Sequence, residues 1–341
     1  MIKLVSLFSG SSGNCIFLSN GITRILIDAG LSGKRIESAL AEVGERPADL
    51  SAILVTHEHS DHTMGIGVIA RRYKIPIHAS NGTWEALGKV PGKLGPDQKC
   101  IFVPGERFRI GEVEVEPFTI PHDAAEPVGY SFYLENRKVT VATDLGHMNR
   151  TLLRNLEGSD LVLLESNHDI EMLKMGRYPW PLKQRILGDH GHLCNDMAGK
   201  VVAHLVQNGT KGVLLGHLSH ENNFPELAWQ TAANALAEKN LTPGEGFHME
   251  VARRDRTSSI VWMEGDRAWS EPVGFAGLPP EQIGLPGLTG LDAELNFSGD
   301  ENSSGTANVS GEVTRTGMKN SAEGLYLSAE LPSFLKVAED D

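Results

Sequence analysis

The chain of 341 residues is 40% hydrophobic and 22% charged, which is the ordinary composition of a globular protein. Its apolar runs are shorter than the roughly 20 residues that a membrane span needs, so we expect no membrane partner. A net charge of −13 would disfavour nucleic-acid binding if it were evenly distributed along the chain.

The acidic charge is concentrated near the C-terminus. From residue 270 to residue 341, twelve acidic residues stand against three basic ones, among many Gly, Pro and Ser residues. Such a segment buries too little apolar surface to offset the entropy of ordering. We therefore expect residues 1–268 to form one folded catalytic domain and residues 269–341 a disordered acidic tail. Only residues 324–337 are apolar enough to dock, as a short helix or an added strand.

The N-terminus and the cysteines indicate the compartment. The first eight residues lack the basic flank and the long apolar core of a signal peptide, and they are expected to form a first strand. The three cysteines, Cys15, Cys100 and Cys194, are odd in number and widely spaced, which argues against a disulfide framework and for small buried side chains. We expect a cytoplasmic protein.

The pattern of the first half predicts strands followed by a helix. Residues 3–8, 15–18 and 24–28 are short β-rich runs separated by turn residues, which predicts an antiparallel meander. Residues 32–43 have apolar side chains at helical spacing and end before Gly44. A buried strand is expected at residues 52–56.

A second pass of the same kind begins near residue 106. Strands are expected at residues 107–110, 113–120, 130–134 and 139–142, followed by a helix and a strand at 161–164. Two meanders that each lead into β–α units predict an α/β fold, an αβ/βα four-layer sandwich with its site between two sheets.

The segment Thr56-His57-Glu58-His59-Ser60-Asp61-His62 places four potential metal ligands within six positions, directly after an apolar strand. Alternate histidines in an extended segment point the same way, whereas Asp61 and His62 project from the first turn of the next helix. The loop can therefore face two ions. Imidazole and carboxylate ligands suit zinc, manganese or iron without deciding among them.

Three further residues at strand ends complete two ion sites. They are His122 in Ile120-Pro121-His122, Asp144 in Ala142-Thr143-Asp144, and His217 in Leu215-Gly216-His217. Each alone is more often a cap or turn residue. Together with the histidine loop, they supply enough ligands for two divalent ions, zinc or manganese.

With these three residues, the motif from His57 to His62 resembles the metallo-β-lactamase superfamily, over residues 1 to about 265. The resemblance implies that His57, His59 and His122 hold one ion, that Asp61, His62 and His217 hold the other, and that Asp144 bridges both. Asp28 resembles the first motif of the superfamily, and we expect it to orient the histidine loop rather than to bind metal. Asp144 stands where common β-lactamases have cysteine, which disfavours antibiotic hydrolysis.

Several longer segments resemble the YycJ (WalJ) family. They are Ser9 to Cys15, Leu26 to Ser32, Pro121 to Tyr130 and His217 to Asn223. The resemblance implies a metallo-β-lactamase-fold exonuclease that acts 5′ to 3′ on DNA, without the inserted β-CASP domain of larger relatives. For such hydrolysis, two ions that share a carboxylate suit a metal-bridging hydroxide as nucleophile. Family members often have serine where this chain has Cys194.

Further polar residues near the expected ligands are candidates for catalysis and substrate binding. Asp61 and His192 are the catalytic candidates, with His192 as proton donor. The phosphate-binding candidates are Ser11, Ser12, Asn14, Asn167, His168, His190, Ser219 and Asn222. The alternative is that these side chains fix ligand tautomers or cap helices. Basic residues at 34–35, 71–74, 174–185 and 253–256 are candidate DNA contacts or solvated helix faces. Among them, aromatic and basic residues interleave at 176–181, in a loop between helices where single-stranded bases could stack.

The leading hypothesis is a dinuclear-metal DNA exonuclease. The alternative is a small-molecule hydrolase, either a cyclic phosphodiesterase or a glyoxalase-II-like thioesterase, and a third class is a metal-binding module without catalysis. Contacts along a charged polymer weaken with added salt, whereas hydrolysis of a small ester should be much less affected, so salt dependence separates the first two. The sequence does not define the oligomeric state.

Overall fold

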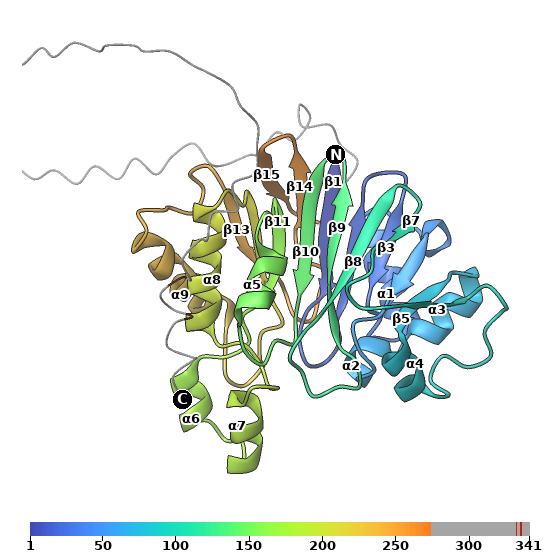
Figure 1. Cartoon of the computed structure of the whole chain (residues 1–341), viewed down its shortest axis with the longest axis horizontal. Coiled ribbons are helices and arrows are strands. Elements are labelled where there is room, and N and C mark those ends of the chain that lie inside the picture. Colours follow the sequence, from blue (N-terminus) through green and yellow to red (C-terminus); the bar gives the residue numbers. More distant parts are fainter. Residues whose placement is uncertain (274–331, 333–334, 336–341) are drawn as a thin grey trace, which may run out of the picture. The chain divides into compact units, whose positions relative to one another are not determined.

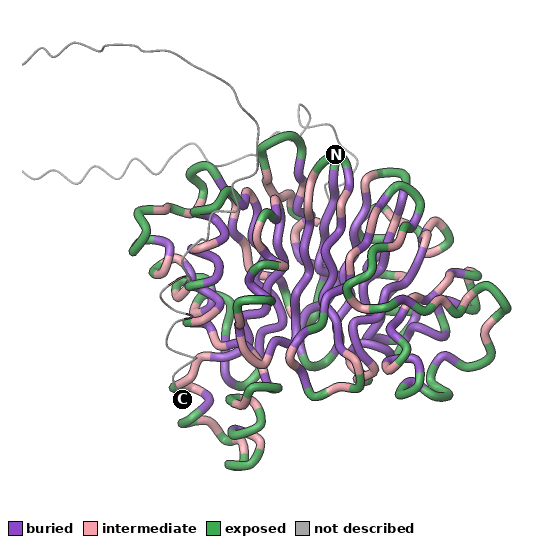
Figure 2. The backbone as a smooth tube through the Cα atoms, in the orientation of Figure 1, coloured by how far each residue is buried: buried purple, intermediate pink, exposed green. Residues whose placement is uncertain are grey.

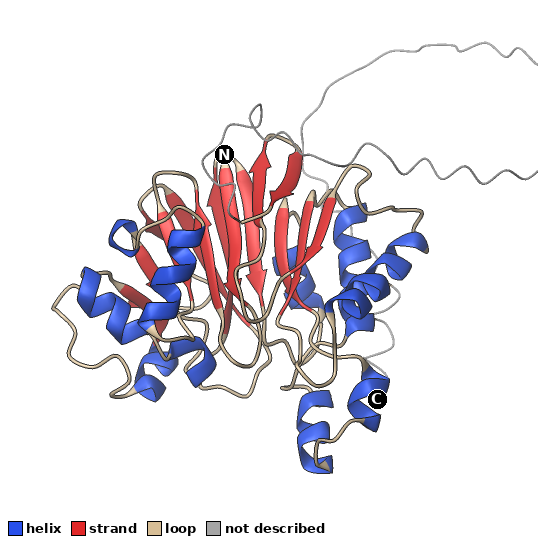
Figure 3. Ribbon diagram, turned by 180° about the vertical axis from the view of Figure 1, so that it is seen from behind, coloured by secondary structure: helices blue, strands red, loops and turns tan. Residues whose placement is uncertain are grey.

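The computed structural model describes residues 1–273 together with Pro332 and Leu335. Within residues 1–273, two β-sheets face each other and helices cover their outer faces (Figures 1 and 3). The predicted α/β class and its αβ/βα four-layer architecture are confirmed.

The first sheet has eight strands. Its order is β15 (Arg267–Glu271), β14 (Ile260–Glu264), β1 (Ile2–Phe8), β2 (Cys15–Ser19), β3 (Arg24–Ile27), β4 (Ala52–Leu54), β5 (Ile77–Ser80) and β6 (Lys99–Phe102). The pairs from β15 to β3 are antiparallel, and those from β3 to β6 are parallel. The expected meander is therefore present, and it continues into parallel strands joined by helices, as crossover connections require.

The second sheet has seven strands and the same plan. Its order is β13 (His248–Val251), β12 (Gly212–Gly216), β11 (Leu161–Glu165), β10 (Arg137–Ala142), β9 (Val128–Leu134), β8 (Val113–Thr119) and β7 (Phe108–Ile110). Strands β7 to β10 pair antiparallel and β10 to β13 pair parallel. The carboxyl ends of the parallel strands in each sheet lie at one edge, which is where sites form in such folds.

Most helices pack on the outer faces of the sheets. The first sheet is accompanied by α1 (Gly33–Glu42), η1 (Pro47–Asp49), α2 (Ser60–Thr63), α3 (Ile66–Tyr73) and α4 (Asn81–Leu87), and the second by α5 (Arg150–Leu156), α8 (Asn195–Gln207) and α9 (Pro225–Ala237). Two short helices, α6 (Ile170–Met175) and α7 (Trp180–Leu187), instead project beyond the strand ends. Among the described residues, no helix is long and apolar enough to cross a membrane.

The core has separate layers on the two faces of the first sheet. Leu4 and Ile25 belong to the cluster between the sheets, whereas their neighbours Val5 and Leu26 belong to the cluster under the outer helices. Successive side chains of a strand point to opposite faces, so a strand buried on both faces is apolar throughout. Figure 2 shows this burial along the central strands. It explains why β1 reads as an almost continuous apolar run.

One predicted boundary is wrong. The sequence placed the end of the folded domain at residue 268, but that residue lies inside β15, which pairs with β14 and extends to Glu271. Arg267, Ser270 and Glu271 make β15 polar in composition, like the tail, although its pairing with β14 makes it part of the sheet. The predicted disordered tail lies largely outside the described residues. Leu335, in the segment expected to dock, is buried at 5% exposure.

Replacement of Leu163 by alanine tests the layer between the sheets. Leu163 lies in β11 and is fully buried in this cluster, so Leu163→Ala should lower the free energy of unfolding by about 2–5 kcal/mol. Chemical denaturation measures the change. Ile22→Ala, at an exposed turn position, should stay within about 0.5 kcal/mol of wild type. An equal loss in both variants would contradict the assignment of Leu163 to the core.

Candidate metal centre

The predicted ligands meet at the carboxyl ends of the strands. Those on the first sheet follow β4 and open α2, whereas those on the second sheet follow β8, β10 and β12. Among the described residues, four groups of potential ligand atoms gather there, each within 4.8 Å: His57, His59 and His122; Asp61, His62 and His217; His57, His62 and Asp144; and Asp144, Glu165, His192 and His217. The structure thus brings together all seven side chains that the sequence assigned to metal, in the same two groups.

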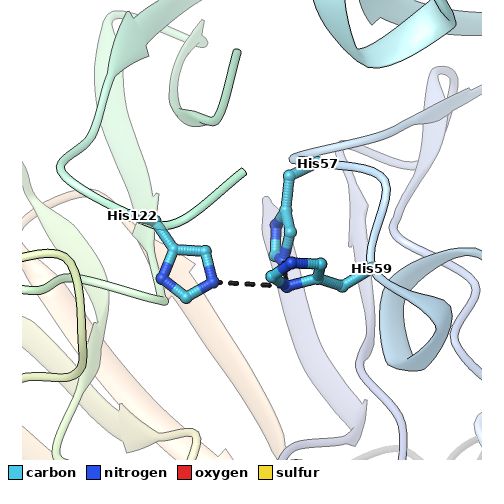
Figure 4. A group of neighbouring side chains, drawn as sticks. All are labelled: His57, His59 and His122. Carbon is cyan, nitrogen blue, oxygen red and sulfur yellow. Dashed lines mark hydrogen bonds between the residues drawn. The ribbon is translucent and has the colours of Figure 1, made fainter. Parts of the chain in front are cut away.

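The first group consists of three histidines. Nε2 of His57 lies 3.0 Å from Nδ1 of His59, and Nε2 of His122 lies 3.4 Å from the same atom (Figure 4). Figure 4 shows His122 facing the other two rings from the opposite side. Burial, and after it the neighbouring imidazoles, lowers the pKa of His57 well below its usual value. Neutral imidazole is the form that binds metal.

The second group adds carboxylates. Nε2 of His62 lies 3.5 Å from Asp61 Oδ2 and 3.4 Å from Asp144 Oδ2, and Nδ1 of His217 lies 3.3 Å from Asp144 Oδ1. Asp144 also lies 3.8 Å from Nε2 of His122. It is therefore in reach of both groups, as a bridging ligand must be.

Two polar atoms of this site suit a cation. Oδ2 of Asp144 and Nε2 of His217 are buried and have no hydrogen-bond partner among the described residues. Buried polar atoms are nearly always paired, and an unpaired carboxylate oxygen is especially costly. Nitrogen and oxygen donors with this spacing suit a divalent ion such as zinc or manganese.

Asp28 lies behind the histidine loop, where the sequence placed it. Its Oδ2 is 2.7 Å from Nδ1 of His62 and accepts a 2.8 Å hydrogen bond from the Thr56 hydroxyl, while Oδ1 accepts one from the Thr56 backbone N–H. A carboxylate on Nδ1 fixes the tautomer and turns Nε2 toward the site. Asp28 therefore orients His62 from the side away from the ligand groups.

Glu165, at the end of β11, was missed by sequence reasoning. This fully buried carboxylate contacts Nδ1 of both His192, at 2.8 Å, and His217, at 3.0 Å. Its other oxygen accepts hydrogen bonds from the backbone N–H groups of Leu145 and Leu193. Burial opposes ionisation, but the two histidines and these contacts outweigh it and lower the pKa of Glu165. The sequence did contain a feature that could have indicated Glu165. It is an acidic residue at the end of an apolar strand, the same position that drew attention to Asp28.

His192 lies at the edge of the site. Its ring centroid is 5.4 Å from that of His122 and 5.3 Å from that of His217, and its side chain is partly exposed. Burial opposes a charge on this ring, but the Glu165 carboxylate outweighs it and raises the pKa of His192 to about 9. A protonated ring whose Nδ1 faces Glu165 leaves Nε2–H available as a donor.

The phosphate-binding candidates fall into two groups. Ser11, Ser12 and His190 are exposed, and Asn14 is buried with its amide nitrogen 2.9 Å from Nε2 of His62. These side chains lie in solvent or in the ligand cluster.

Three of the remaining four lie in the His217 loop or contact it. The Asn167 amide donates to the backbone carbonyl of His217, and the Ser219 hydroxyl accepts from Asn222, which favours a structural role for these three. His168 is buried with both ring nitrogens unpaired among the described residues, and burial lowers its pKa to about 4.

Three site residues have left-handed backbone conformations. Asp28, Asp144 and His217 have φ angles of 59°, 59° and 56°. Non-glycine residues rarely occupy this region, and where they do the conformation is often maintained for function. Asp28 and His217 directly follow β3 and β12, and Asp144 comes two residues after the end of β10, so each left-handed turn lies where the chain leaves its strand at the site.

The comparisons agree with this geometry. The model of the β-lactamase superfamily domain matches residues 23–217. Two solved structures share the fold: the metallo-β-lactamase fold protein YhfI from Bacillus subtilis, with a TM-score of 0.57, 16% identity and coverage of 76% of this chain and 99% of that one, and a diphosphatase from the PhnP family, with a TM-score of 0.53, 18% identity and coverage of 77% and 98%. The chain belongs to the β-lactamase superfamily.

Curated relatives define the family more narrowly. Exodeoxyribonuclease YycJ from Bacillus anthracis is 44% identical over 243 residues, which cover 71% of this chain and 92% of the relative. Exodeoxyribonuclease WalJ from Streptococcus pneumoniae is 44% identical over 261 residues, which cover 76% and 97%. Within the superfamily, the chain therefore belongs to the family of the exodeoxyribonucleases YycJ and WalJ, and the resemblance noted in the sequence is confirmed.

Removal of the Glu165 carboxylate tests its part in holding the site. Because Glu165 orients His217 and His192, Glu165→Ala should weaken binding of Mn²⁺ about 10- to 100-fold. Titration calorimetry with the metal-free protein measures the affinity. The control is Glu157→Ala, which removes a partly exposed carboxylate bound to His204 on the outer helices. Wild-type affinity in Glu165→Ala would contradict the proposed role.

Proposed function

We propose that the protein is an exodeoxyribonuclease that degrades DNA in the 5′ to 3′ direction with two divalent metal ions, zinc or manganese. His57, His59 and His122 would hold one ion and Asp61, His62 and His217 the other, with Asp144 between them. The observation that carries the proposal is this pair of ligand groups sharing one buried carboxylate, in a chain 44% identical to two exodeoxyribonucleases.

Two adjacent divalent ions supply charge stabilisation to a phosphodiester and lower the pKa of water. The chain's own residues hold this arrangement in place. Asp28 and Glu165, at the back of the site, fix the orientation of His62 and His217. Asp61 is the more exposed carboxylate of the ligand set, so it faces the side from which a phosphate enters.

His192 is the proton donor of the proposed reaction. Its Nδ1 is held by Glu165, so its Nε2–H is free to protonate the 3′ oxygen that leaves when the phosphodiester is cleaved. The ring is at the partly exposed edge of the site, between His122 and His217. This position allows it to reach a substrate atom without being a member of either three-residue ligand group.

The direction and the metal dependence of cleavage can be measured together. Purified protein with Mn²⁺ or Zn²⁺ should release 5′ label from duplex DNA before 3′ label, and Asp61→Ala should lose at least about 100-fold of this activity because it removes a ligand. Gel electrophoresis of both labelled duplexes records polarity. The control is Asp49→Ala, which removes a surface carboxylate that pairs with Arg46, away from the site.

Absence of DNA degradation by wild type under both metals would contradict the proposal. Hydrolysis of cyclic phosphodiesters or thioesters in the same preparation would then support the small-molecule alternative.

The role of His192 predicts a separation of metal binding from turnover. His192→Ala should retain the metal content of wild type, measured by atomic emission, while the rate of DNA degradation falls about 10²- to 10⁴-fold. His204→Ala is the control, because this histidine lies on α8 and pairs with Glu157 outside the site. Loss of metal from His192→Ala would instead make His192 a ligand or a structural residue.

A further inference from the structure

Helices α6 and α7 form a hairpin, residues 169–187, that projects beyond the strand ends on the side of the metal centre (Figures 1 and 3). Figure 2 shows its surface as mostly exposed or intermediate. It carries three large exposed apolar side chains: Met175 at 86% exposure, Trp180 at 62% and Leu187 at 41%. Three such side chains within residues 175–187 make the hairpin a candidate interaction surface.

Hydrogen bonds within the hairpin hold its two helices together although most of its surface is exposed. The buried ammonium group of Lys183 donates 2.7 Å hydrogen bonds to the carbonyl oxygens of both Lys174 and Gly176, at the end of α6. At the start of α6, the Asp169 carboxylate accepts a 2.7 Å hydrogen bond from the Met172 N–H. Free carbonyl and N–H groups at helix ends need such partners. The exposed side chains are therefore presented on a fixed support.

The hairpin is attached to the loops that carry ligands. Arg185 forms an ion pair of 2.6 Å with Asp123, the residue after His122. The N–H of Asp169 donates to the Asn222 carbonyl, in the loop that follows His217. On the same side, a Cβ at Gly176 would lie 2.6 Å from the Asn222 side-chain oxygen, so the two segments are in direct contact. The position of the hairpin relative to the metal centre is therefore fixed by contacts with two loops, the one that carries His122 and the one that follows His217.

Charge and aromatic character indicate the occupant. The hairpin contains four basic residues and two acidic ones, Asp169 and Glu171, whereas the whole chain has a net charge of −13. Lys174 and Arg185 form ion pairs and the Lys183 ammonium donates to carbonyl oxygens, so within the described part of the chain Arg177 is the hairpin's uncompensated cation. At the tip, exposed Arg177 and Trp180 flank the half-buried Tyr178. Proteins bind unpaired nucleotides with aromatic side chains, on which bases stack, and with nearby cations, which attract the phosphates.

We propose that this hairpin is a platform for unpaired nucleotides of the DNA substrate, with bases stacked on Trp180 and Tyr178 and a phosphate held by Arg177. The proposal rests on the exonuclease function and adds a contact outside the metal centre. It also assigns the hairpin a role in specificity, because a substrate with an unpaired segment gains a stacking contact that a fully paired end lacks.

Binding of a fluorescein-labelled single-stranded oligonucleotide tests the platform. In the full-length Asp61→Ala protein, Trp180→Ala should weaken binding about tenfold or more by fluorescence anisotropy, whereas Trp180→Phe should retain most of the affinity because a phenyl ring also stacks. The matched control is Trp229→Ala, which removes the 37%-exposed tryptophan of α9. It should bind like its parent.

Each outcome separates the platform from the proposed function. Unchanged DNA affinity in Trp180→Ala, with a wild-type protein that degrades DNA, would overturn the platform alone and leave the hairpin as a protein contact. Equal weakening of DNA binding in Trp229→Ala would also overturn the platform. So would a loss of Mn²⁺ binding, measured by calorimetry, in a Trp180→Ala protein that retains Asp61. A wild-type protein that neither binds nor degrades DNA would overturn the exonuclease function and the platform together.

Discussion

Compensation of buried carboxylates is the constraint on which the site depends. Asp28, Asp144 and Glu165 are almost completely buried, and each is placed within hydrogen-bond or ion-pair distance of at least one histidine ring. A buried carboxylate without a partner is unfavourable, because its lost hydration is not replaced. Rotation of one of these histidine rings away from its carboxylate would therefore destabilise the folded state. Asp28 and Glu165 contact histidines from behind the site, and one oxygen of Asp144 has no hydrogen-bond partner among the described residues. The same contacts therefore stabilise the fold and orient the ligands.

The backbone conformation at the strand ends determines where these side chains lie. Asp28, Asp144 and His217 each leave their strand in a left-handed conformation, a strain that the surrounding hydrogen bonds must offset. The Ser9 hydroxyl, for instance, accepts a 2.7 Å hydrogen bond from the His217 N–H. Close backbone contact has a similar effect at Gly30, where a Cβ would lie 1.6 Å from the Asp61 carbonyl oxygen. The ligand loops are thus positioned by main-chain contacts as much as by their side chains.

Sequence reasoning succeeded where the signal is local. The two meanders and the contiguous run from His57 to His62 were recognisable because their periods and spacings lie within a few residues. Glu165 was missed because its partners, His192 and His217, are 27 and 52 residues away, and only the packing of parallel strands brings them together. The end of the domain was misplaced because β15 is polar in composition and becomes a strand by pairing with β14. The structure also separates the phosphate-binding candidates into exposed side chains and side chains with structural contacts. The Asn167 amide, for example, donates a hydrogen bond to the backbone carbonyl of His217.

The division of the ligands between the sheets has a consequence for how such a site can arise. In each group of three, two ligands come from the first sheet and one from the second: His57 and His59 with His122, and Asp61 and His62 with His217. The two halves of the domain have similar architecture, yet neither contains a complete set. Either half alone would therefore supply only part of each of these two groups. Inheritance of this chemistry requires both halves to be kept together as one unit.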